Sequence, residues 1–448
     1  MNGRDEYGGR LSGASILVVD DEPGMRNFLT KILGPHVKLV EQAASPSEAT
    51  RRLDETHYDL VILDNIMPGR TGLDWLDEQR RKGLFAETIL ITAYADLDTA
   101  IAALRVGVGD FVLKPFRANQ ILGAVARALD RRSLRRDNTL LRRELHAGGA
   151  GAGKLLGKSE PMVAVRGMLE KLAPLPTPVL FTGASGTGKE LAARQLHRLS
   201  DRAEKPFVAV NCAAIAPGRI VPELFGTVDG PDKLTPGLLL LADGGTLFLD
   251  EVAQMPEPLQ AAMLRVLEDQ RLRPEGAARE IPLDLRFLFA TNADLKAEVA
   301  AGRFRADLYH RINVMQIEMP PLRDRSEDIV ELAALFLAQF QASLGMRGLK
   351  LNDETLLKLR RYDWPGNVRE LRNLIERSVI LGAFPEEFAG AGKVTGVQAV
   401  ENLDLVMQRH MMHILDLSGG NRAEAARRLG VSRKTIDRKM AVWSDETE

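Results

Sequence analysis

The chain has 448 residues, a formal net charge of −1 and an isoelectric point near 6.7. This length is too great for one hydrophobic core and predicts about three domains, and the balanced charge excludes a globally basic nucleic-acid-binding protein. Cys212 is the only cysteine, which excludes disulfides and thiolate zinc sites. The sequence shows neither a leader-like start nor an apolar run of about 18 residues, so we expect a cytoplasmic protein without a membrane partner.

Residues 14–131 follow a polar tail at 1–13 and alternate apolar runs with amphipathic stretches. The apolar runs are SILVVD, KLVEQA, DLVILD, TILITA and FVLK. A strand followed by a helix, repeated five times, predicts a doubly wound parallel sheet of the flavodoxin-like type.

The carboxyl ends of these predicted strands carry five polar residues: Asp20, Asp21, Asp64, Thr92 and Lys114. Ligands bind at this edge of doubly wound sheets. Three converging carboxylates would repel one another, which favours a bound hard cation, most simply Mg²⁺. A carboxylate beside the cation can accept a phosphoryl group whose oxygens Lys114 and Thr92 would hold. Each residue taken alone would be read as a solvated polar group at a strand end.

These residues resemble the receiver domain of two-component response regulators. The string DNIMPGRTG and the LKP that contains Lys114 match the receiver pattern. The resemblance implies that a histidine kinase phosphorylates Asp64, that Asp20 and Asp21 hold magnesium with it, and that Phe111 is the switch aromatic. Phe111 is equally compatible with a place in the core.

Residues 132–153 form the predicted helical linker and joint. Between Leu122 and Leu145, leucines and a valine recur mostly at spacings of three, four or seven. The last receiver helix is therefore expected to continue and to pair with its copy in a homodimer. The arginines of this stretch are more simply read as a solvated face than as a nucleic-acid site, and GGAGAG at 148–153 predicts a flexible joint.

A glycine-rich stretch, GASGTGKE, follows an apolar run and precedes a helical pattern. Strand, glycine loop and helix together predict a phosphate-binding loop that takes ATP, in preference to an incidental glycine turn. The backbone N–H groups and the helix N-terminus would bind phosphate, and the lysine would reach the terminal phosphates. The predicted ATP-binding residues are Gly183, Ser185, Gly186, Thr187, Gly188, Lys189 and Glu190.

Other strand ends downstream carry residues suited to ATP hydrolysis. Asp250 is placed to hold the magnesium of a nucleotide, and Glu251 to polarise the attacking water. Asn292 ends another strand and could orient that water. Arg305 and Arg311 are expected on one helix face, from which they could reach a neighbouring subunit's nucleotide as arginine fingers.

The segment resembles the AAA+ domain of NtrC-type activators of sigma-54 RNA polymerase. The matching strings are LLGKSEPM, VNCAAI, ELFG, FRADLYHR and WPGNVRELRN. The resemblance implies a Walker-type α/β subdomain at 154–320, a helical lid at 321–385, and a ring, usually hexameric, that hydrolyses ATP. It also implies that Asn211 restrains Glu251, and Arg369 is read as a lid contact. Glu190 departs from the usual Ser or Thr, as this family allows.

A larger departure follows ELFG. NtrC-type activators continue with the motif GAFTGA, the tip of a loop that grips sigma-54. Here the chain reads TVDGPDKLTPG, which is shorter, lacks a Phe-Thr tip, and is stiffened by Pro231 and Pro236. The gripping loop is therefore expected to be missing.

After a linker at 386–400, residues 401–445 predict a helix-turn-helix. The string NRAEAARRLG is followed by VSRKTIDRKM, whose helix Ser432 would cap. Residues 422–439 include seven basic and two acidic side chains, which suits phosphate contacts and major-groove readout better than a solvated hairpin. The stretch resembles the Fis-type helix-turn-helix, whose dimer implies a palindromic site on double-stranded DNA. The predicted groove-facing residues are Arg433, Lys434, Thr435, Arg438 and Lys439.

The sequence leaves two functions open. The favoured one is a DNA-binding response regulator that binds ATP but acts through another RNA polymerase holoenzyme form, or by repression, rather than as a standard sigma-54 remodeller. The alternative is a conventional ATP-hydrolysing sigma-54-dependent activator with an unorthodox contact loop. The hydrolysis residues leave ATPase activity open, and the flanking domains argue against a chaperone or transport ATPase.

Overall fold

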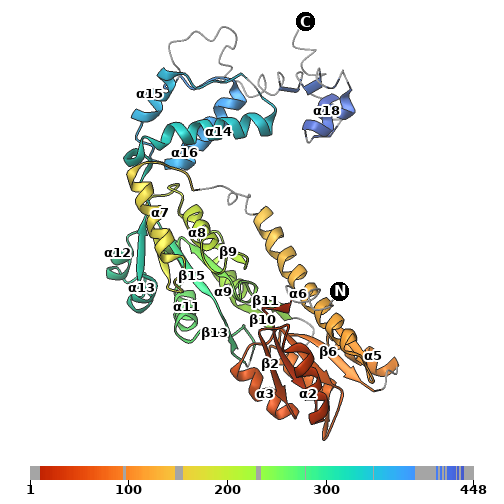
Figure 1. Ribbon diagram of the computed structural model, residues 1–448. Helices are drawn as coiled ribbons and strands as arrows, with labels where there is room; N and C mark the ends of the chain where they lie inside the picture. Colours follow the sequence, from red (N-terminus) through yellow and green to blue (C-terminus); the bar gives the residue numbers. More distant parts are fainter. Residues whose placement is uncertain are drawn as a thin grey trace. The chain divides into compact units, whose positions relative to one another are not determined.

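The computed structural model describes residues 11–93, 97–146, 155–228, 234–277, 279–346 and 348–388, and parts of 410–437 (Figure 1). The chain divides into two compact units. The first comprises residues 1–332 and 363–371, and the second comprises residues 333–362 and 372–448.

The first unit begins with a five-stranded parallel sheet in the order β2-β1-β3-β6-β7. Each predicted apolar run of residues 14–131 forms one of its strands, so the doubly wound fold is confirmed. The strands are β1 (Ser15–Val19), β2 (Leu39–Ala43), β3 (Leu60–Asp64), β6 (Glu87–Thr92) and β7 (Asp110–Leu113). A small hairpin, β4 (Ile66–Met67) and β5 (Arg70–Thr71), follows β3.

Helices cover both faces of this sheet because alternate strand residues point to opposite sides. Ile16 and Val18 pack with α2 and α6, whereas Leu17 and Val19 pack with α3, α4 and α5. Ser45 caps α3 by accepting the Glu48 N–H at 3.2 Å. The helices are α2 (Pro23–Leu33), α3 (Pro46–Glu55), α4 (Gly72–Arg81), α5 (Leu97–Arg105) and α6 (Ala118–His146).

The predicted continuation of the last receiver helix is present, because α6 is one helix of 29 residues. Figure 1 shows it as a single long orange helix. Its first half carries the buried residues Ile121, Ala124, Val125 and Ala128. Leu134, farther along, is 69% exposed. The apolar spacing therefore continues beyond the part of α6 that packs against the sheet.

A second five-stranded parallel sheet, in the order β16-β8-β15-β12-β9, forms the centre of the remaining first unit. Its strands are β8 (Val179–Thr182), β9 (Phe207–Asn211), β12 (Thr246–Asp250), β15 (Arg286–Thr291) and β16 (Met315–Glu318). Its inner strands β8, β12 and β15 are buried in almost every position, as expected for a sheet covered on both faces.

Two groups of helices cover this sheet. One face packs against α7 (Glu160–Leu172) and α8 (Lys189–Arg198). The other packs against α9 (Pro217–Phe225), α10 (Leu238–Leu241), α11 (Glu257–Asp269) and α13 (Ala306–Ile312). The remaining short elements are α12 (Leu295–Ala300), η1 (Val252–Gln254), η2 (Leu322–Arg325), and the hairpins β10 (Gly226–Val228) with β11 (Leu234–Pro236) and β13 (Arg271–Leu272) with β14 (Ile281–Pro282).

The second unit is helical in its described part. It holds most of α14 (Asp328–Leu344), α15 (Asp353–Arg361) and most of α16 (Asn367–Leu381), and later α18 (Arg422–Leu429). Asn352 caps α15 by accepting the Thr355 N–H at 2.7 Å. The first residues of α14 and α16 belong to the first unit, and Val368 N–H there donates to the carbonyl oxygen of Gly186, in the loop after β8.

Candidate functional sites

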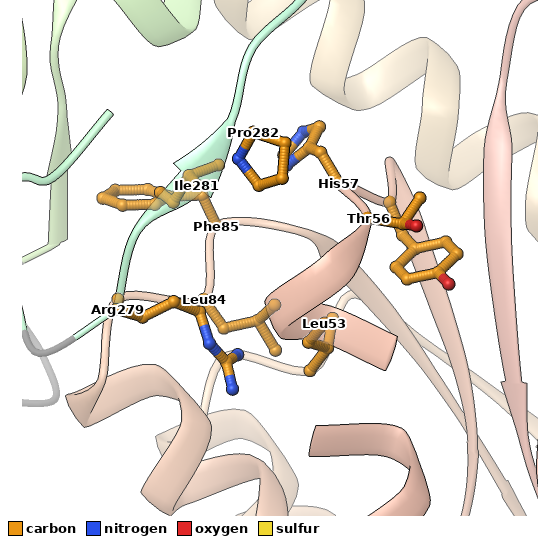
Figure 2. Close-up of a pocket in the computed structure, with 10 residues that line it drawn as sticks. Leu53, Thr56, His57, Leu84, Phe85, Arg279, Ile281 and Pro282 are labelled. Carbon is orange, nitrogen blue, oxygen red and sulfur yellow. The ribbon is translucent and has the colours of Figure 1, made fainter. Parts of the chain in front are cut away.

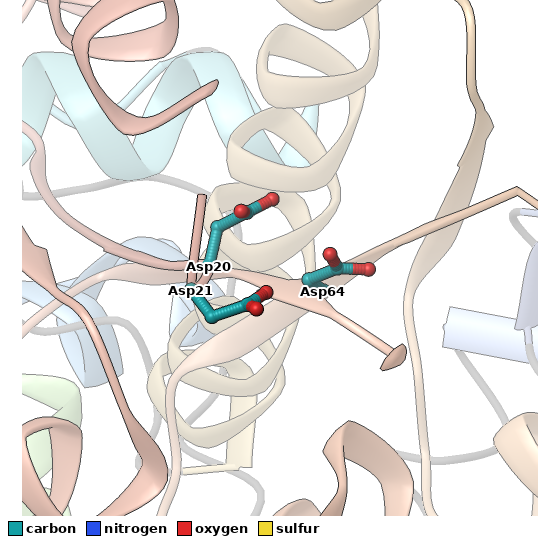
Figure 3. A group of neighbouring side chains, drawn as sticks. All are labelled: Asp20, Asp21 and Asp64. Carbon is teal, nitrogen blue, oxygen red and sulfur yellow. The ribbon is translucent and has the colours of Figure 1, made fainter. Parts of the chain in front are cut away.

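The three predicted acidic residues of the first sheet lie together at its carboxyl edge (Figure 3). Asp20 and Asp21 follow β1, and Asp64 ends β3; the neighbouring pairing of Val19 with Leu63 brings these strand ends side by side. One oxygen from each carboxylate lies within 4.8 Å of the others. Three hard oxygen donors at this spacing fit Mg²⁺.

Lys114 joins this carboxylate site from the end of β7. Its Nζ lies 2.7 Å from Asp64 Oδ2 and 3.1 Å from Asp20 Oδ2. Burial alone would lower the pKa of Lys114, but the hydrogen bonds to Asp64 and Asp20 raise it above its ordinary value. Burial raises the pKa of Asp20, against hydrogen bonds from the Glu22 N–H and Lys114. The lysine is therefore a fixed positive charge beside Asp64.

The two other predicted receiver residues occupy different surroundings. Thr92 ends β6, next to β3, and is buried. Phe111 lies on β7, is partly buried, and packs against the cluster that contains Ala103 and Leu90. Thr92 thus lies on the strand next to that of Asp64. Phe111 packs in the core, as expected if it is a core residue.

The predicted phosphate loop joins β8 to α8. Gly183, Gly186 and Gly188 have φ angles of 137°, 79° and 104°, which favour glycine. A Cβ on Gly186 would lie 2.4 Å from the Gly366 carbonyl oxygen, and one on Gly183 2.7 Å from that of Met319. The loop is therefore shaped by close backbone approach on its outer side, and α8 starts directly behind it.

Side chains of the predicted nucleotide site converge on this loop. Lys189 Nζ donates to the Gly183 and Ala184 carbonyl oxygens at 2.8 and 3.3 Å. Arg369 Nη1 donates to Ser185 Oγ at 3.0 Å. Burial lowers the pKa of Lys189, although the nearby Glu251 and Asp250 carboxylates act to raise it. Glu190 accepts from Arg194 Nε at 3.0 Å, so its carboxylate is engaged on its own helix.

Asp250 and Glu251 lie at the end of β12. Asp250 pairs with Asn211 across the β12–β9 register, and its Oδ1 accepts the Glu251 N–H at 2.9 Å. Burial and the adjacent Glu251 raise the pKa of Asp250. Glu251 has a positive φ of 54°, a left-handed backbone that is unfavourable for Glu. Asn292 follows β15 and is exposed.

The expectation that Arg305 and Arg311 share a helix face is wrong. Arg305 is the residue before α13, not part of it, and its guanidinium pairs with Asp307 at 2.8 Å. Arg311 lies in the last turn of α13, where Nη2 donates to the Leu267 carbonyl at 3.0 Å. They do not share a helix face, because α13 begins only at Ala306. Both side chains are nevertheless exposed.

The helix-turn-helix is described only in part. The residues predicted to read DNA other than Thr435 lie outside the described residues: Arg433, Lys434, Arg438 and Lys439. The predicted cap is present, because Ser432 Oγ accepts the Thr435 N–H at 3.1 Å. Ala425, Ala426 and Ile436 are buried together with Met411 and Leu415, so the small-residue face packs as expected.

A small pocket elsewhere in the first unit holds none of the predicted site residues (Figure 2). Residues 53, 56–58, 83–85, 279, 281 and 282 line it. Arg279 lines it and donates to Asp54 Oδ1 and Gln79 Oε1 at 2.7 and 2.8 Å. We assign no ligand to it.

A receiver-type carboxylate site, a phosphate-loop module and a Fis-type helix pair define a multidomain response regulator. Sequence profiles agree over most of the chain: a response regulator receiver domain at 16–126, a sigma-54 interaction domain at 155–318, an AAA+ ATPase lid domain at 323–387 and a bacterial regulatory protein of the Fis family at 404–443. Among the described residues, no helix combines the length and apolarity needed to cross a membrane.

The chain is similar along its length to characterised regulators. It is 37% identical to the response regulator protein PilR of Pseudomonas aeruginosa, covering 95% of this chain and 98% of PilR. It is 36% identical to the regulatory protein AtoC of Escherichia coli, covering 95% and 96%. Crystal structures of NtrX from Brucella abortus with ADP and with ATP align at 33% identity and a TM-score of 0.51, covering 96% of this chain and 99% of NtrX. The chain belongs to the NtrC family of response regulators.

Two side chains at the phosphate loop were not predicted from the sequence. Asn367 and Arg325, both buried, donate to loop carbonyl oxygens. The only sequence signal is the Gly-Asn pair in WPGNVREL, since Asn tolerates a positive φ. Nothing in the sequence around Arg325 distinguishes it from a surface arginine.

Proposed function

We propose that this protein is a transcriptional regulator in which a histidine kinase phosphorylates Asp64. The observation that supports this most directly is the contact of Lys114 Nζ with Asp64 Oδ2 at 2.7 Å, beside Asp20 and Asp21. Asp20, Asp21 and Asp64 would hold Mg²⁺, which supplies charge neutralisation for the incoming phosphoryl group. Lys114 would bind a phosphoryl oxygen, and Thr92 is proposed as the hydroxyl that binds another.

We propose that the second sheet binds ATP. The loop of residues 183–188, whose glycines have positive φ angles, leads into the start of α8, where the helix dipole favours an anion. Lys189 and Arg369 would contact the phosphates, and Asp250 would hold the nucleotide's Mg²⁺. Glu251 and Asn292 are proposed to orient water, with Asn211 restraining Glu251. The Brucella abortus NtrX structures contain ADP or ATP, which supports this assignment by likeness.

The proposed output is binding to a palindromic site on double-stranded DNA in the cytoplasm. The Fis-family match covers residues 404–443, and we propose Arg433, Lys434, Thr435, Arg438 and Lys439 as the groove-facing residues. The exposed Leu134 on α6 supports pairing of two chains along this helix. A hexameric ring, with Arg305 and Arg311 reaching a neighbour's nucleotide, is proposed as the assembled form.

We further propose that the protein acts through a polymerase form other than the sigma-54 holoenzyme, or represses. The segment that follows ELFG, where NtrC-type activators carry GAFTGA, contributes to the short hairpin β10–β11. β10 is hydrogen-bonded on its other side too, because Val228 N–H donates to Glu275 O at 2.9 Å and Glu275 N–H to Gly226 O at 3.0 Å. A strand engaged on both edges has little freedom to extend as a gripping loop, and its sequence carries no Phe-Thr tip.

The alternative is a conventional sigma-54-dependent activator with an unorthodox contact loop. The match of residues 155–318 to the sigma-54 interaction domain favours it. On this alternative, residues between β10 and β11 would contact sigma-54 through different chemistry.

Reconstituted transcription separates the two functions. The template is a promoter fragment selected from genomic DNA by its binding to the purified, phosphorylated chain. Transcripts are measured with the sigma-54 holoenzyme and, separately, with the major holoenzyme, each with ATP or a non-hydrolysable analogue. We expect the regulator to change the output of the major holoenzyme only. ATP-dependent transcripts from the sigma-54 holoenzyme would instead establish the alternative.

A further inference from the structure

The carbonyl oxygens of the phosphate loop are all hydrogen-bonded. From Gly183 to Gly188, each accepts at least one donor. Three of these donors come from residues far along the chain, at positions 325, 367 and 368. These residues lie within the match to the AAA+ lid domain, residues 323–387. The outer side of the loop is thus held by the lid sequence.

Asn367 makes the central contact. Its Nδ2 donates to the Ser185 carbonyl at 3.0 Å, and its Oδ1 accepts the Leu322 N–H at 2.8 Å. The residue is 2% exposed and has a φ of 52°. Asn is among the few residues that adopt this left-handed backbone at low cost. The next N–H, of Val368, donates to the Gly186 carbonyl at 3.0 Å.

Arg325 makes the second contact, from the end of η2. Its Nη2 donates to the Thr187 carbonyl at 2.8 Å, and its Nη1 lies 3.0 Å from Met162 Sδ. The side chain is 3% exposed. Burial lowers the pKa of Arg325, against the opposite influence of Asp328. A buried guanidinium is costly unless its donors are used; Nη2 is used by the loop carbonyl, whereas Nε has no hydrogen-bond partner among the described residues.

These bonds fix the direction of the N–H groups on the other side of the loop. In a planar trans peptide the C=O of one residue and the N–H of the next point in opposite directions. Holding the Ser185 carbonyl outward therefore turns the Gly186 N–H inward. Holding the Thr187 carbonyl does the same for the Gly188 N–H. Both N–H groups precede Lys189 in the loop, where phosphate binding is proposed.

We propose that Asn367 and Arg325 are positioning residues, which orient the phosphate loop for nucleotide and tie nucleotide binding to attachment of the lid. The inference rests on the proposed ATP binding. Because Asn367 also accepts the Leu322 N–H, a change at the loop would reach two parts of the lid sequence, η2 and the start of α16.

Three variants of the full chain test this. Asn367→Asp keeps the acceptor for Leu322 N–H but sets a carboxylate oxygen against the Ser185 carbonyl. Asn367→Gly keeps the backbone angle and removes both side-chain bonds. Arg325→Lys keeps the charge but lacks the planar fork. Affinity for a fluorescent ADP analogue is expected to fall about tenfold or more in Asn367→Asp, and less in Asn367→Gly and Arg325→Lys.

The matched control is Leu371→Ala. Leu371 is fully buried on α16, so its truncation lowers thermal stability by creating a cavity, and it donates none of the hydrogen bonds that hold the loop carbonyl oxygens. It is expected to keep wild-type affinity. Amide hydrogen exchange gives a second readout: nucleotide should protect residues 186–188 in the control but not in Asn367→Asp.

The outcomes are distinct. Equal affinity of the unmodified chain and Asn367→Asp would overturn this inference and leave nucleotide binding intact. A Leu371→Ala variant as weak as Asn367→Asp would also overturn it, because lid stability alone would then set affinity. If the unmodified chain binds no nucleotide, the proposed ATP binding fails and the inference fails with it.

Discussion

The carboxylate site of the first sheet and the phosphate loop of the second lie at the same edge of similar parallel sheets but are built differently. The first is made of side chains. Asp20, Asp64 and Lys114 lie at three strand ends, and Lys114 forms ion pairs with both aspartates. The second is made of backbone, from one continuous loop whose carbonyl oxygens are held by residues such as Asn367. Removing a charge should therefore destroy the first site, whereas distorting a peptide should damage the second.

The largest effect is expected at Asp64. Asp64→Asn removes the proposed acceptor, so labelling by a small phosphodonor such as acetyl phosphate should vanish. Phosphate-affinity electrophoresis provides the measurement. Asp77→Asn is the control, because Asp77 pairs only with Arg81 on the surface of α4 in the contacts of the described chain. Persistent labelling of Asp64→Asn would mean that another aspartate is the acceptor.

The next effect is expected at Lys189. Lys189→Ala removes the charge aimed at the phosphates, and a charge-assisted hydrogen bond contributes about 1.5–3 kcal/mol, or roughly a tenfold to hundredfold change in affinity. Calorimetric titration with ATP measures this change. Lys171→Ala, on the exposed side of α7, should bind as the unmodified chain does. Unchanged affinity of Lys189→Ala would remove the assignment of this loop.

The backbone character of the second site is tested by two glycines. Both Gly186 and Gly188 have positive φ angles, but only at Gly186 would a new Cβ meet other atoms, with the Gly366 oxygen at 2.4 Å. Gly186→Ala should therefore lose about 1–3 kcal/mol more unfolding free energy than Gly188→Ala. Chemical denaturation without nucleotide gives the comparison. Equal losses would show that the loop is not packed against residue 366.

The last effect appears only as the pH falls and concerns an ionisable group on α8, the helix that follows the phosphate loop. His197 on α8 is buried and bonded to Thr246 Oγ1, and burial lowers its pKa to about 4. The unfolded chain then binds the proton more readily between about pH 6.5 and 4, so stability falls as the pH falls through this window, by roughly 1–3 kcal/mol. His197→Gln should flatten this part of the stability profile. Parallel profiles for both proteins would contradict the assignment.

The sequence predicts what depends on local pattern. Strand periodicity placed Asp20, Asp64 and Lys114 at one sheet edge, and the glycine spacing located the phosphate loop, because both signals lie within a few residues. The contact of Asn367 with Ser185 spans 182 positions and leaves no local pattern. The arginine pair was misread for a related reason: spacing alone cannot tell that Arg305 precedes α13 rather than belonging to it.

Under the proposed function, nucleotide at this loop does not drive opening of sigma-54 promoters. Permanganate reactivity of promoter thymines tests it most directly, with the phosphorylated chain, ATP and sigma-54 holoenzyme on a fragment that carries the chain's own binding site. We expect protection of the binding site without reactive thymines at the start site. Reactive thymines that appear with ATP, and not with a non-hydrolysable analogue, would contradict it.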